Sequence, residues 1–136
     1  MSAAYRMAKI ADFEQIMQID NLQRYEQITN AVRKGECTVV EEAAHIVGFA
    51  IMDYTFFDYG FINLIIIAEE HRRLGIGSSM IEHLFGQCKT DKLFTSTNES
   101  NTPMRQLLTK SGFIHCGQID ALDEGDPELF FVRRKI

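Results

Sequence analysis

The chain has 136 residues, of which 46% are hydrophobic and 24% charged, and its formal net charge is -5. This length and composition are typical of one globular domain with its own core, so we expect a single domain over residues 1–136. We predict no nucleic-acid partner, because such binding depends on a basic surface that neutralises phosphates and the net charge of this chain is negative. No apolar run approaches the roughly 20 residues of a membrane-spanning helix, so no membrane partner is predicted.

The cysteines and the first residues bear on location. Cys37, Cys88 and Cys116 are odd in number, far apart and without Cys-x-x-Cys spacing. This pattern predicts reduced thiols rather than a disulfide framework or a zinc site. The four histidines are scattered along the chain, so we predict no metal. The first six residues lack the order of a secretion signal, and we therefore expect a cytoplasmic location.

The first third of the sequence predicts a short strand followed by helices. Tyr5–Met7 suits the strand, and from Ala11 apolar residues recur at helical spacing as far as Leu22. A second helix is predicted over Arg24–Lys34, and Gly35 stands where a helix ends.

The middle of the sequence changes to the pattern of strands. Cys37–Glu42 and Ile46–Phe57 predict a hairpin with a short turn at 43–45. After a second turn at 58–60, Phe61–Ile67 is almost continuously apolar, as expected of an interior strand covered on both faces. The remaining predicted elements are a helix over 76–85, a strand Leu93–Thr97, a helix from Thr102 to Gly112, and strands Phe113–Ile119 and Leu129–Arg134.

A glycine loop, Arg72-Arg73-Leu74-Gly75-Ile76-Gly77, stands where a predicted strand turns into a helix. The two glycines let backbone amides approach a ligand closely, and the start of the helix presents unpaired amides to an anion. With two arginines nearby, this predicts a site for a pyrophosphate, although a tight turn with solvated arginines has the same sequence. The third glycine of a dinucleotide fingerprint would fall at Met80, and the Gly-Lys of a Walker loop is absent, so neither NAD nor ATP is favoured.

In this context the chain resembles the GNAT superfamily of acyl-CoA-dependent N-acetyltransferases. Their signature is Arg or Gln, two residues, Gly, one residue, then Gly or Ala, and here it is filled by Arg72, Gly75 and Gly77. The order of predicted elements is similar over essentially the whole chain. The resemblance implies an α/β GNAT fold, with a mixed, mostly antiparallel sheet whose central strands splay and are flanked by helices. It implies acetyl-CoA as the acyl donor, bound where the strands splay.

The resemblance also implies which residues contact the cofactor. Backbone amides of the strand at Ile65 and Ile67 would receive the pantetheine and the thioester carbonyl. Asn101 begins a second family motif that ends at Gly112-Phe113, and it would hydrogen-bond the pantetheine arm. Asn101 also suits a helix cap, and the two roles are compatible. The predicted cofactor-binding residues are Ile65, Ile67, Arg72, Arg73, Leu74, Gly75, Ile76, Gly77, Ser78, Asn101 and Arg105.

The chain departs from the family pattern at Leu108, where many relatives carry a tyrosine near the departing sulfur. Leucine has no proton to give, so the usual general acid is not carried over. Tyr54, Tyr59, Cys116 or a bound water are alternatives, and each of these side chains is also typical of packing. Because attack on a thioester depends mainly on positioning and on stabilisation of the carbonyl oxygen, transfer stays the predicted reaction.

The general base is also unassigned by the sequence. Relatives often carry Glu on the signature strand, whereas this strand offers Asn63, which orients water but cannot take its proton. Glu26 and Asp53 are the candidate bases, although solvated surface carboxylates are as typical of both positions.

An acidic segment with Asp123, Glu124 and Asp126 lies between the last two predicted strands and would attract an amine cation; a solvated loop is the alternative. We predict direct transfer of an acetyl group to a primary amine of a small molecule. Two alternatives stay open: a non-catalytic acyl-CoA-binding sensor or interaction module, and a protein N-terminal or lysine acetyltransferase. The resemblance also leaves a homodimer open, because relatives often dimerise.

Overall fold

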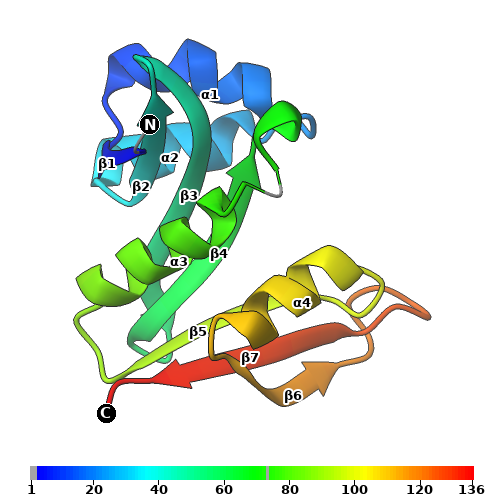
Figure 1. Cartoon of the computed structure of the whole chain (residues 1–136). Coiled ribbons are helices and arrows are strands. Elements are labelled where there is room, and N and C mark those ends of the chain that lie inside the picture. Colours follow the sequence, from blue (N-terminus) through cyan, green and yellow to red (C-terminus); the bar gives the residue numbers. More distant parts are fainter. Residues whose placement is uncertain (1–2, 73) are drawn as a thin grey trace. The chain divides into compact units, whose positions relative to one another are not determined.

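The computed structural model describes residues 3–72 and 74–136, which form a mixed α/β structure (Figure 1). Backbone hydrogen bonds order the strands β1-β2-β3-β4-β5-β7-β6 in one seven-stranded sheet. Only the β4–β5 pair is parallel among the ladders β1–β2, β2–β3, β4–β5, β5–β7 and β6–β7, which confirms the predicted mostly antiparallel sheet. The elements are β1 (Ala4–Met7), η1 (Ile10–Asp12), α1 (Phe13–Ile19), α2 (Tyr25–Lys34), β2 (Cys37–Glu42), β3 (His45–Phe56), β4 (Tyr59–Ile67), η2 (Glu69–His71), α3 (Ile76–Gln87), β5 (Lys92–Asn98), α4 (Thr102–Lys110), β6 (Ile114–Ile119) and β7 (Glu128–Arg134).

The chain divides into two compact units. Unit 1 comprises Met1–Met52 and Leu64–His83, and unit 2 comprises Asp53–Asn63 and Leu84–Ile136. Three elements, β3, β4 and α3, contribute residues to both units, so the division does not follow element boundaries. The single domain expected over residues 1–136 stays a prediction.

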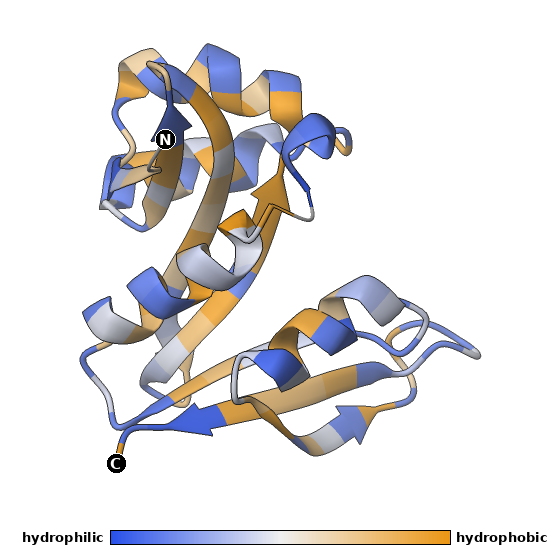
Figure 2. Cartoon of the chain, in the orientation of Figure 1, coloured by the Kyte–Doolittle hydropathy of each residue, from blue (hydrophilic) through white to orange (hydrophobic). Residues whose placement is uncertain are grey.

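The core of unit 1 joins helices α1 and α2 to strands β2 and β3. Ile16, Ile28 and Phe49 are completely buried there. On α2, the buried residues recur at the helical spacing that the sequence predicts, and they form one apolar face. Gly35 ends this helix in the left-handed conformation, with φ 71°. Figure 2 shows apolar residues concentrated on β2, β3 and β4, and hydrophilic residues on η2.

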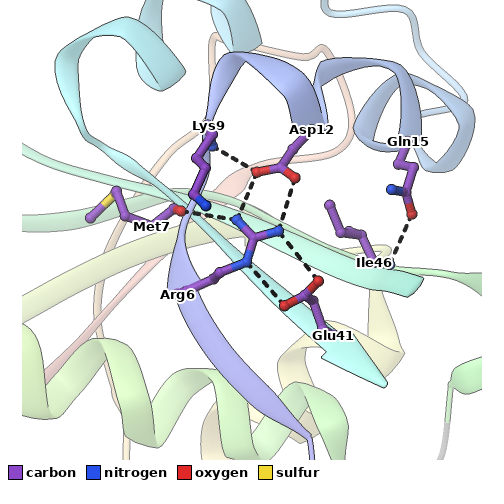
Figure 3. Close-up of polar contacts among 7 residues, drawn as sticks. All are labelled: Arg6, Met7, Lys9, Asp12, Gln15, Glu41 and Ile46. Atoms are coloured by element: carbon purple, nitrogen blue, oxygen red, sulfur yellow. Dashed lines mark hydrogen bonds and ion pairs between the residues drawn. The ribbon is translucent and has the colours of Figure 1, made fainter. Parts of the chain in front are cut away.

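A charged network ties β1 to the start of the helical region (Figure 3). Arg6 donates from both terminal nitrogens to the Asp12 carboxylate, at 2.8 and 2.9 Å, and its Nε donates to Glu41 on β2 at 3.0 Å. The backbone amide of Lys9 also donates to Asp12. The hydrogen bonds from Arg6 hold the pKa of Asp12 below its ordinary value, and the two carboxylates raise the pKa of Arg6. A carboxylate that is almost fully buried is thus completely paired.

Helix α3 is attached to strand β1 within unit 1. Ile76 and Met80 are buried, as the helical spacing predicts. The Tyr5 hydroxyl and Ser79 Oγ share a short hydrogen bond, and the Tyr5 ring stacks on His83 with ring centroids 4.9 Å apart. Burial lowers the pKa of His83. The helix that follows the glycine loop is therefore held by β1, an edge strand.

The first helical stretch is shorter than its apolar spacing predicts. Helix α1 ends at Ile19, so Leu22 lies outside it and is 65% exposed. The cause is Asp20, a buried residue whose carboxylate accepts hydrogen bonds from the backbone amides of Leu22 and Arg24. These bonds organise a turn in place of a further helical turn.

Two-residue turns close both hairpins of the β2–β3–β4 meander. Ala43 and Ala44 have φ of 51° and 67°, and Phe57 and Asp58 have the same two values. Positive φ at both central residues is the pattern of a type I′ turn, which suits the twist of a hairpin. The second turn was predicted at 58–60, whereas β4 already begins at Tyr59.

Gly60 therefore lies within β4 rather than in a turn. A Cβ at this position would collide with the Sγ of Cys88, and the Gly60 amide donates to Thr90 Oγ1 at 3.0 Å. Close backbone approach explains this glycine, as is common for glycine inside a strand.

Unit 2 places β5 between β4 and β7, with α4 over the strands (Figure 1). Side chains of β5 alternate, so that Leu93, Thr95 and Thr97 are buried and the residues between them are half-buried. The parallel ladder ends at Ile62 and Thr95, whereas β4 continues to Ile67 and β5 to Asn98. Complete cover of β4 on both faces was wrong, because Asn63 is exposed and the four residues after it are half-buried.

Candidate functional site

The end of β4 turns back on itself before α3 begins. After Ile67 the chain forms the short helix η2, and Arg72 then returns to extended backbone. Its Nε donates to the Ile67 carbonyl at 2.9 Å. The sequence predicts strand, glycine loop and helix in direct succession, so η2 is an addition that places Arg72 next to the end of the strand.

The glycine loop has the backbone that an anion site requires. Gly75 has φ of 84°, in the left-handed region, and no heavy atom lies within 4 Å of the position that its Cβ would occupy. The Ser79 amide donates to the Gly75 carbonyl at 3.0 Å, which is the first bond of α3. The amides of Ile76, Gly77 and Ser78 therefore lack partners within the helix and are suited to phosphate oxygens.

The other residues of the predicted loop add charge and exposure. Arg72 and Leu74 are exposed, and Leu74 is an apolar side chain with 66% exposure. Arg73 lies outside the described residues. The Arg72 side chain uses Nε for the Ile67 carbonyl, which leaves its terminal N–H groups as donors for a ligand.

Strand β4 presents two sets of side chains just before the loop. Leu64 and Ile66 pack against the unit 1 core. Because side chains alternate along a strand, Ile65 and Ile67 point to the opposite face, and both are half-buried. The segment that the resemblance assigns to the pantetheine thus lies beyond the last residue of the parallel ladder.

Asn101 and Arg105 lie at the start of α4 in unit 2. Asn101 Oδ1 accepts a hydrogen bond from the Met104 amide at 3.3 Å, so its capping role is confirmed. Arg105 donates to the Glu99 carbonyl at 3.0 Å. The contact of Asn101 with pantetheine stays a prediction, and its side-chain NH₂ group is the donor that remains for it.

No replacement for the missing tyrosine emerges among the described residues. Leu108 is 1% exposed and packs in the core. Tyr54 uses its hydroxyl to accept from the Lys89 amide at 3.0 Å, and Tyr59 stacks edge-on against Phe94. Cys116 is exposed on β6, and desolvation raises the pKa of its thiol, which disfavours a reactive thiolate.

The candidate bases differ in how far their side chains are already engaged. Asp53 accepts from both the amide and the hydroxyl of Thr55, so it forms a local turn. Glu26, in the first turn of α2, and Asn63, on β4, are exposed, and no hydrogen bond or ion pair engages either side chain within the described part of the chain. No such contact joins Asp53, Tyr54 and Asn63 to one another within those residues either.

The acidic segment is bound to its own neighbours. Asp126 accepts from the amide and the hydroxyl of Ser100, at 3.0 and 2.6 Å, and Asp123 accepts from Asn98 at 3.0 Å. Only Glu124, of the three predicted acceptor residues, is exposed without such a bond in the residues that the structure covers. The segment clamps the connection between β5 and α4.

A cavity of about 770 Å³ in unit 1 was not predicted. Residues from α1, the end of β2 and its turn, β3 and η2 line it, including Glu42, Glu70 and His71. These residues are far apart in the sequence and form no motif, so periodicity and spacing carry no signal for them. The histidines are scattered along the sequence, and only the fold brings His71 to Glu42.

Neither a metal-binding group nor a membrane-spanning helix occurs among the described residues. Over residues 3–72 and 74–136, no group of three His, Cys, Asp or Glu side chains is arranged to hold a metal ion. No helix in that part of the chain has both the length and the apolar character needed to cross a membrane.

Comparison with known proteins identifies the family of this chain. The sequence model described as Acetyltransferase (GNAT) family matches residues 3–113. An acetyltransferase of the GNAT family from Bacillus cereus ATCC 10987 is 37% identical, with a TM-score of 0.94, and the match covers 100% of this chain and 99% of that one. Curated protein sequences gave no match.

Two more distant structures share the fold over their whole lengths. A candidate streptothricin acetyltransferase from Bacillus anthracis str. Ames, solved in complex with acetyl coenzyme A, has a TM-score of 0.87 at 16% identity, with 100% of each chain covered. The NatC complex bound to Gag peptide and CoA matches with a TM-score of 0.80 at 14% identity, again with 100% of each chain covered.

Proposed function

The chain belongs to the GNAT family of acetyltransferases, and on that premise we propose that it transfers the acetyl group of acetyl-CoA to a primary amine of a small molecule. The observation that carries the proposal is the loop between β4 and α3. Its open, left-handed Gly75 and the free amides of the first turn of α3 suit a pyrophosphate. The B. anthracis relative, whose structure contains acetyl coenzyme A, supports the choice of donor.

Different groups of this chain would hold different parts of acetyl-CoA. Amides from Ile76 to Ser78 and the terminal N–H groups of Arg72 would hold the pyrophosphate. The backbone of β4 at Ile65 and Ile67, beyond the end of the parallel ladder, would align the pantetheine, and Asn101 would donate to it. When bound, acetyl-CoA supplies a thioester whose carbonyl carbon is open to attack.

The reaction needs no covalent acyl-enzyme. The neutral amine attacks the carbonyl carbon, the C–N bond forms and the C–S bond breaks, and coenzyme A leaves as thiolate. The amine loses a proton to a base or water, and the thiolate gains one from water, because Leu108 supplies none. Glu26, or water oriented by Asn63, is the proposed route for the first proton, since Asp53 and Tyr54 are already engaged.

Leu108 favours one rival function, an acyl-CoA-binding sensor that has lost the chemistry. Release of thiol separates the two. We expect thiol release from acetyl-CoA with members of a panel of small primary amines, above the rate of hydrolysis. If no amine raises that rate while calorimetry still records coenzyme A binding, the transferase proposal fails and the sensor stands.

A protein acetyltransferase is the second rival, favoured by the fold shared with the NatC complex. Peptides with free amino termini and peptides with an internal lysine belong in the same assay. If peptides are acetylated at higher kcat/KM than every small amine, the small-molecule acceptor is wrong and the donor assignment stands.

A variant tests the loop itself. Gly77→Trp is expected to abolish measurable coenzyme A binding, because the indole fills the space beside the amides. Gly86→Trp is the matched control on the same helix, where no heavy atom lies within 4 Å of the Cβ position, and it should bind as wild type. Unchanged affinity of folded Gly77→Trp, checked by circular dichroism, would defeat the proposed site.

A further inference from the structure

One face of the sheet in unit 2 is lined by phenylalanine rings. The Phe56 ring lies 4.8 Å from the Phe61 ring and 5.1 Å from the Phe94 ring, measured between centroids. The Phe130 ring stacks on Phe56 at 5.8 Å. These four side chains come from β3, β4, β5 and β7, and all of them are half-buried. We call the side of the sheet that carries them the aromatic face.

The register of the ladders shows which other side chains share the aromatic face. Phe130 and Val132 of β7 pair with Ser96 and Phe94 of β5, respectively. On the other side of β7, Ile114 of β6 pairs with Val132. Directly paired residues point to the same side of a sheet, so Ile114 extends the aromatic face as far as the edge strand.

The helices of unit 2 lie on the opposite face. A Cβ on Gly112, just after α4, would lie 3.6 Å from Arg133 Nε, and the Arg133 guanidinium lies 3.9 Å from the centre of the Phe85 ring of α3. Arg133 alternates with Val132 and Arg134 along β7, so these two residues point away from both helices. Within the described chain, the aromatic face thus carries no helix of unit 2.

The first end of the aromatic face is positively charged. Lys92 of β5 pairs directly with Arg134 of β7, so two cations stand opposite each other in the ladder. Neither of them forms an ion pair with a carboxylate in the described part of the chain, although the Lys92 ammonium lies 5.4 Å from the Tyr59 ring centroid. Like charges in this position repel each other, and a carboxylate from another molecule would offset the repulsion.

The second end of the aromatic face is negatively charged. Glu128 begins β7, six residues before Arg134, and its carboxylate accepts from Ser96 Oγ at 2.7 Å. It pairs with Ile119 of the edge strand. Because the spacing is even, Glu128 and Arg134 share one face of the strand and are separated by about 20 Å. An apolar middle thus lies between a carboxylate and a guanidinium.

A surface with this pattern of charge is complementary to a second copy of itself. If two aromatic faces stack with their β7 strands antiparallel, a twofold axis crosses the middle of the strands. Each Glu128 then lies opposite Arg134 of the other copy, and the contact occurs twice. With the strands parallel, Glu128 would meet Glu128, which is unfavourable. The charges therefore select one of the two ways in which the faces can stack.

From these features we propose that the aromatic face is a homodimer interface, in which two copies pack sheet on sheet with antiparallel strands and pair Glu128 with Arg134 across a twofold axis. Aromatic side chains in the middle and charges at the rim are typical of such interfaces. Ile114 and Ile119, which are 63% and 44% exposed, become covered. None of these side chains is assigned to acetyl-CoA or to the amine, so the dimer does not depend on the proposed function.

Sedimentation equilibrium of the full chain measures the dimer directly. We expect wild type to dimerise, and we expect Glu128→Arg and Arg134→Glu each to weaken the dimer by about tenfold or more, because each variant places two pairs of like charges across the axis. Glu14→Arg on α1 and Arg33→Glu on α2 make the same changes of charge outside unit 2 and should stay within about twofold of wild type. A wild-type chain that is monomeric at every concentration would overturn the proposal.

A mixture of the two charge variants separates the interface from a loss of folding. Glu128→Arg alone brings cations together and Arg134→Glu alone brings carboxylates together, whereas a heterodimer of the two variants pairs opposite charges at both contacts. The mixture should therefore dimerise more tightly than either variant alone. The double variant Glu128→Arg/Arg134→Glu should also recover the dimer. If the mixture and the double variant both stay monomeric while circular dichroism shows native spectra, the antiparallel pairing is wrong.

The apolar part of the interface has its own variant. Ile114→Glu is expected to weaken the dimer by about fivefold or more, because it covers a carboxylate with apolar surface. Leu22→Glu, at a residue of unit 1 with a similar exposure of 65%, is the matched control and should dimerise as wild type. A wild-type dimer that persists unchanged in Ile114→Glu and in both charge variants would form through another surface, and would overturn the proposal.

Discussion

Two acidic regions of this molecule differ in what their carboxylates do. In the segment 123–128, Asp123 and Asp126 accept hydrogen bonds from Asn98 and Ser100. Beside His71, the carboxylates of Glu69 and Glu70, which line the cavity, form no hydrogen bond or ion pair with the described residues. The first set of carboxylates holds the fold together, whereas the second is available to a ligand. Charge in a sequence therefore indicates function only after its partners in the fold are known.

The largest expected effect tests whether a fully paired carboxylate stabilises the fold. Arg6→Met removes the bidentate partner of Asp12, whose side chain is 9% exposed. We expect the free energy of unfolding to fall by about 2–3 kcal/mol, because the carboxylate is left buried without its cation. Urea denaturation measures this, with the exposed Arg33→Met as control; equal midpoints for Arg6→Met and wild type would contradict it.

A smaller effect of the same network appears on acidification. Arg6 lowers the pKa of Asp12 below its unfolded value of about 4, so this carboxylate stabilises the fold above that pH and ceases to do so as the pH falls through the folded pKa. Between about pH 5 and pH 2 the urea midpoint should fall more steeply for wild type than for Asp12→Asn. Parallel curves would show that Asp12 is not stabilised by Arg6.

The acidic segment should show a moderate effect on stability and none on binding. Asp126→Ala removes two hydrogen bonds to Ser100, and we expect a loss of about 1 kcal/mol in the free energy of unfolding. The neighbouring Glu124→Ala should change it by less than about 0.5 kcal/mol. If Asp126→Ala instead weakens amine binding and leaves stability unchanged, the two acidic regions have been assigned the wrong way round.

The cavity should show the smallest effect on stability. Glu70→Gln removes a carboxylate that pairs with nothing in the described residues, so the free energy of unfolding should move by less than about 0.5 kcal/mol. Thermal unfolding monitored by circular dichroism is a sufficient measurement. A large loss would mean that the Glu70 carboxylate has a structural role.

Much of the fold follows from local pattern in the sequence. The buried face of α2 and the left-handed Gly35 are read directly from helical spacing and the position of a glycine. The end of α1 cannot be read from the sequence in this way. Apolar spacing continues to Leu22, whereas the Asp20 carboxylate accepts from the backbone amides beyond the helix and ends it at Ile19. A side chain that pairs with nearby backbone can outweigh periodicity.

The candidate site likewise contains residues that the sequence predicts and residues that only the fold brings together. The glycine loop is contiguous, so its residues and its anion chemistry are visible in the sequence, and the family is confirmed by comparison. The cavity brings together Gln15, Glu42 and His71, which only the folded chain places side by side. The sequence also favoured the acidic segment as acceptor site, because it does not show that Ser100 and Asn98 already occupy two of its carboxylates.

The two hairpin turns have a consequence for how this protein reaches its structure. Ala43-Ala44 and Phe57-Asp58 adopt left-handed backbone that Asn-Gly supplies at much lower cost. Neither turn is thus favoured in the unfolded chain, and the register of β3 and β4 has to be selected by packing between distant residues. Such contacts form late and slowly compared with local ones. The strand that is proposed to carry the pantetheine thus acquires its alignment as the hydrophobic core assembles, and core substitutions far from the loop should slow refolding of the binding-competent protein.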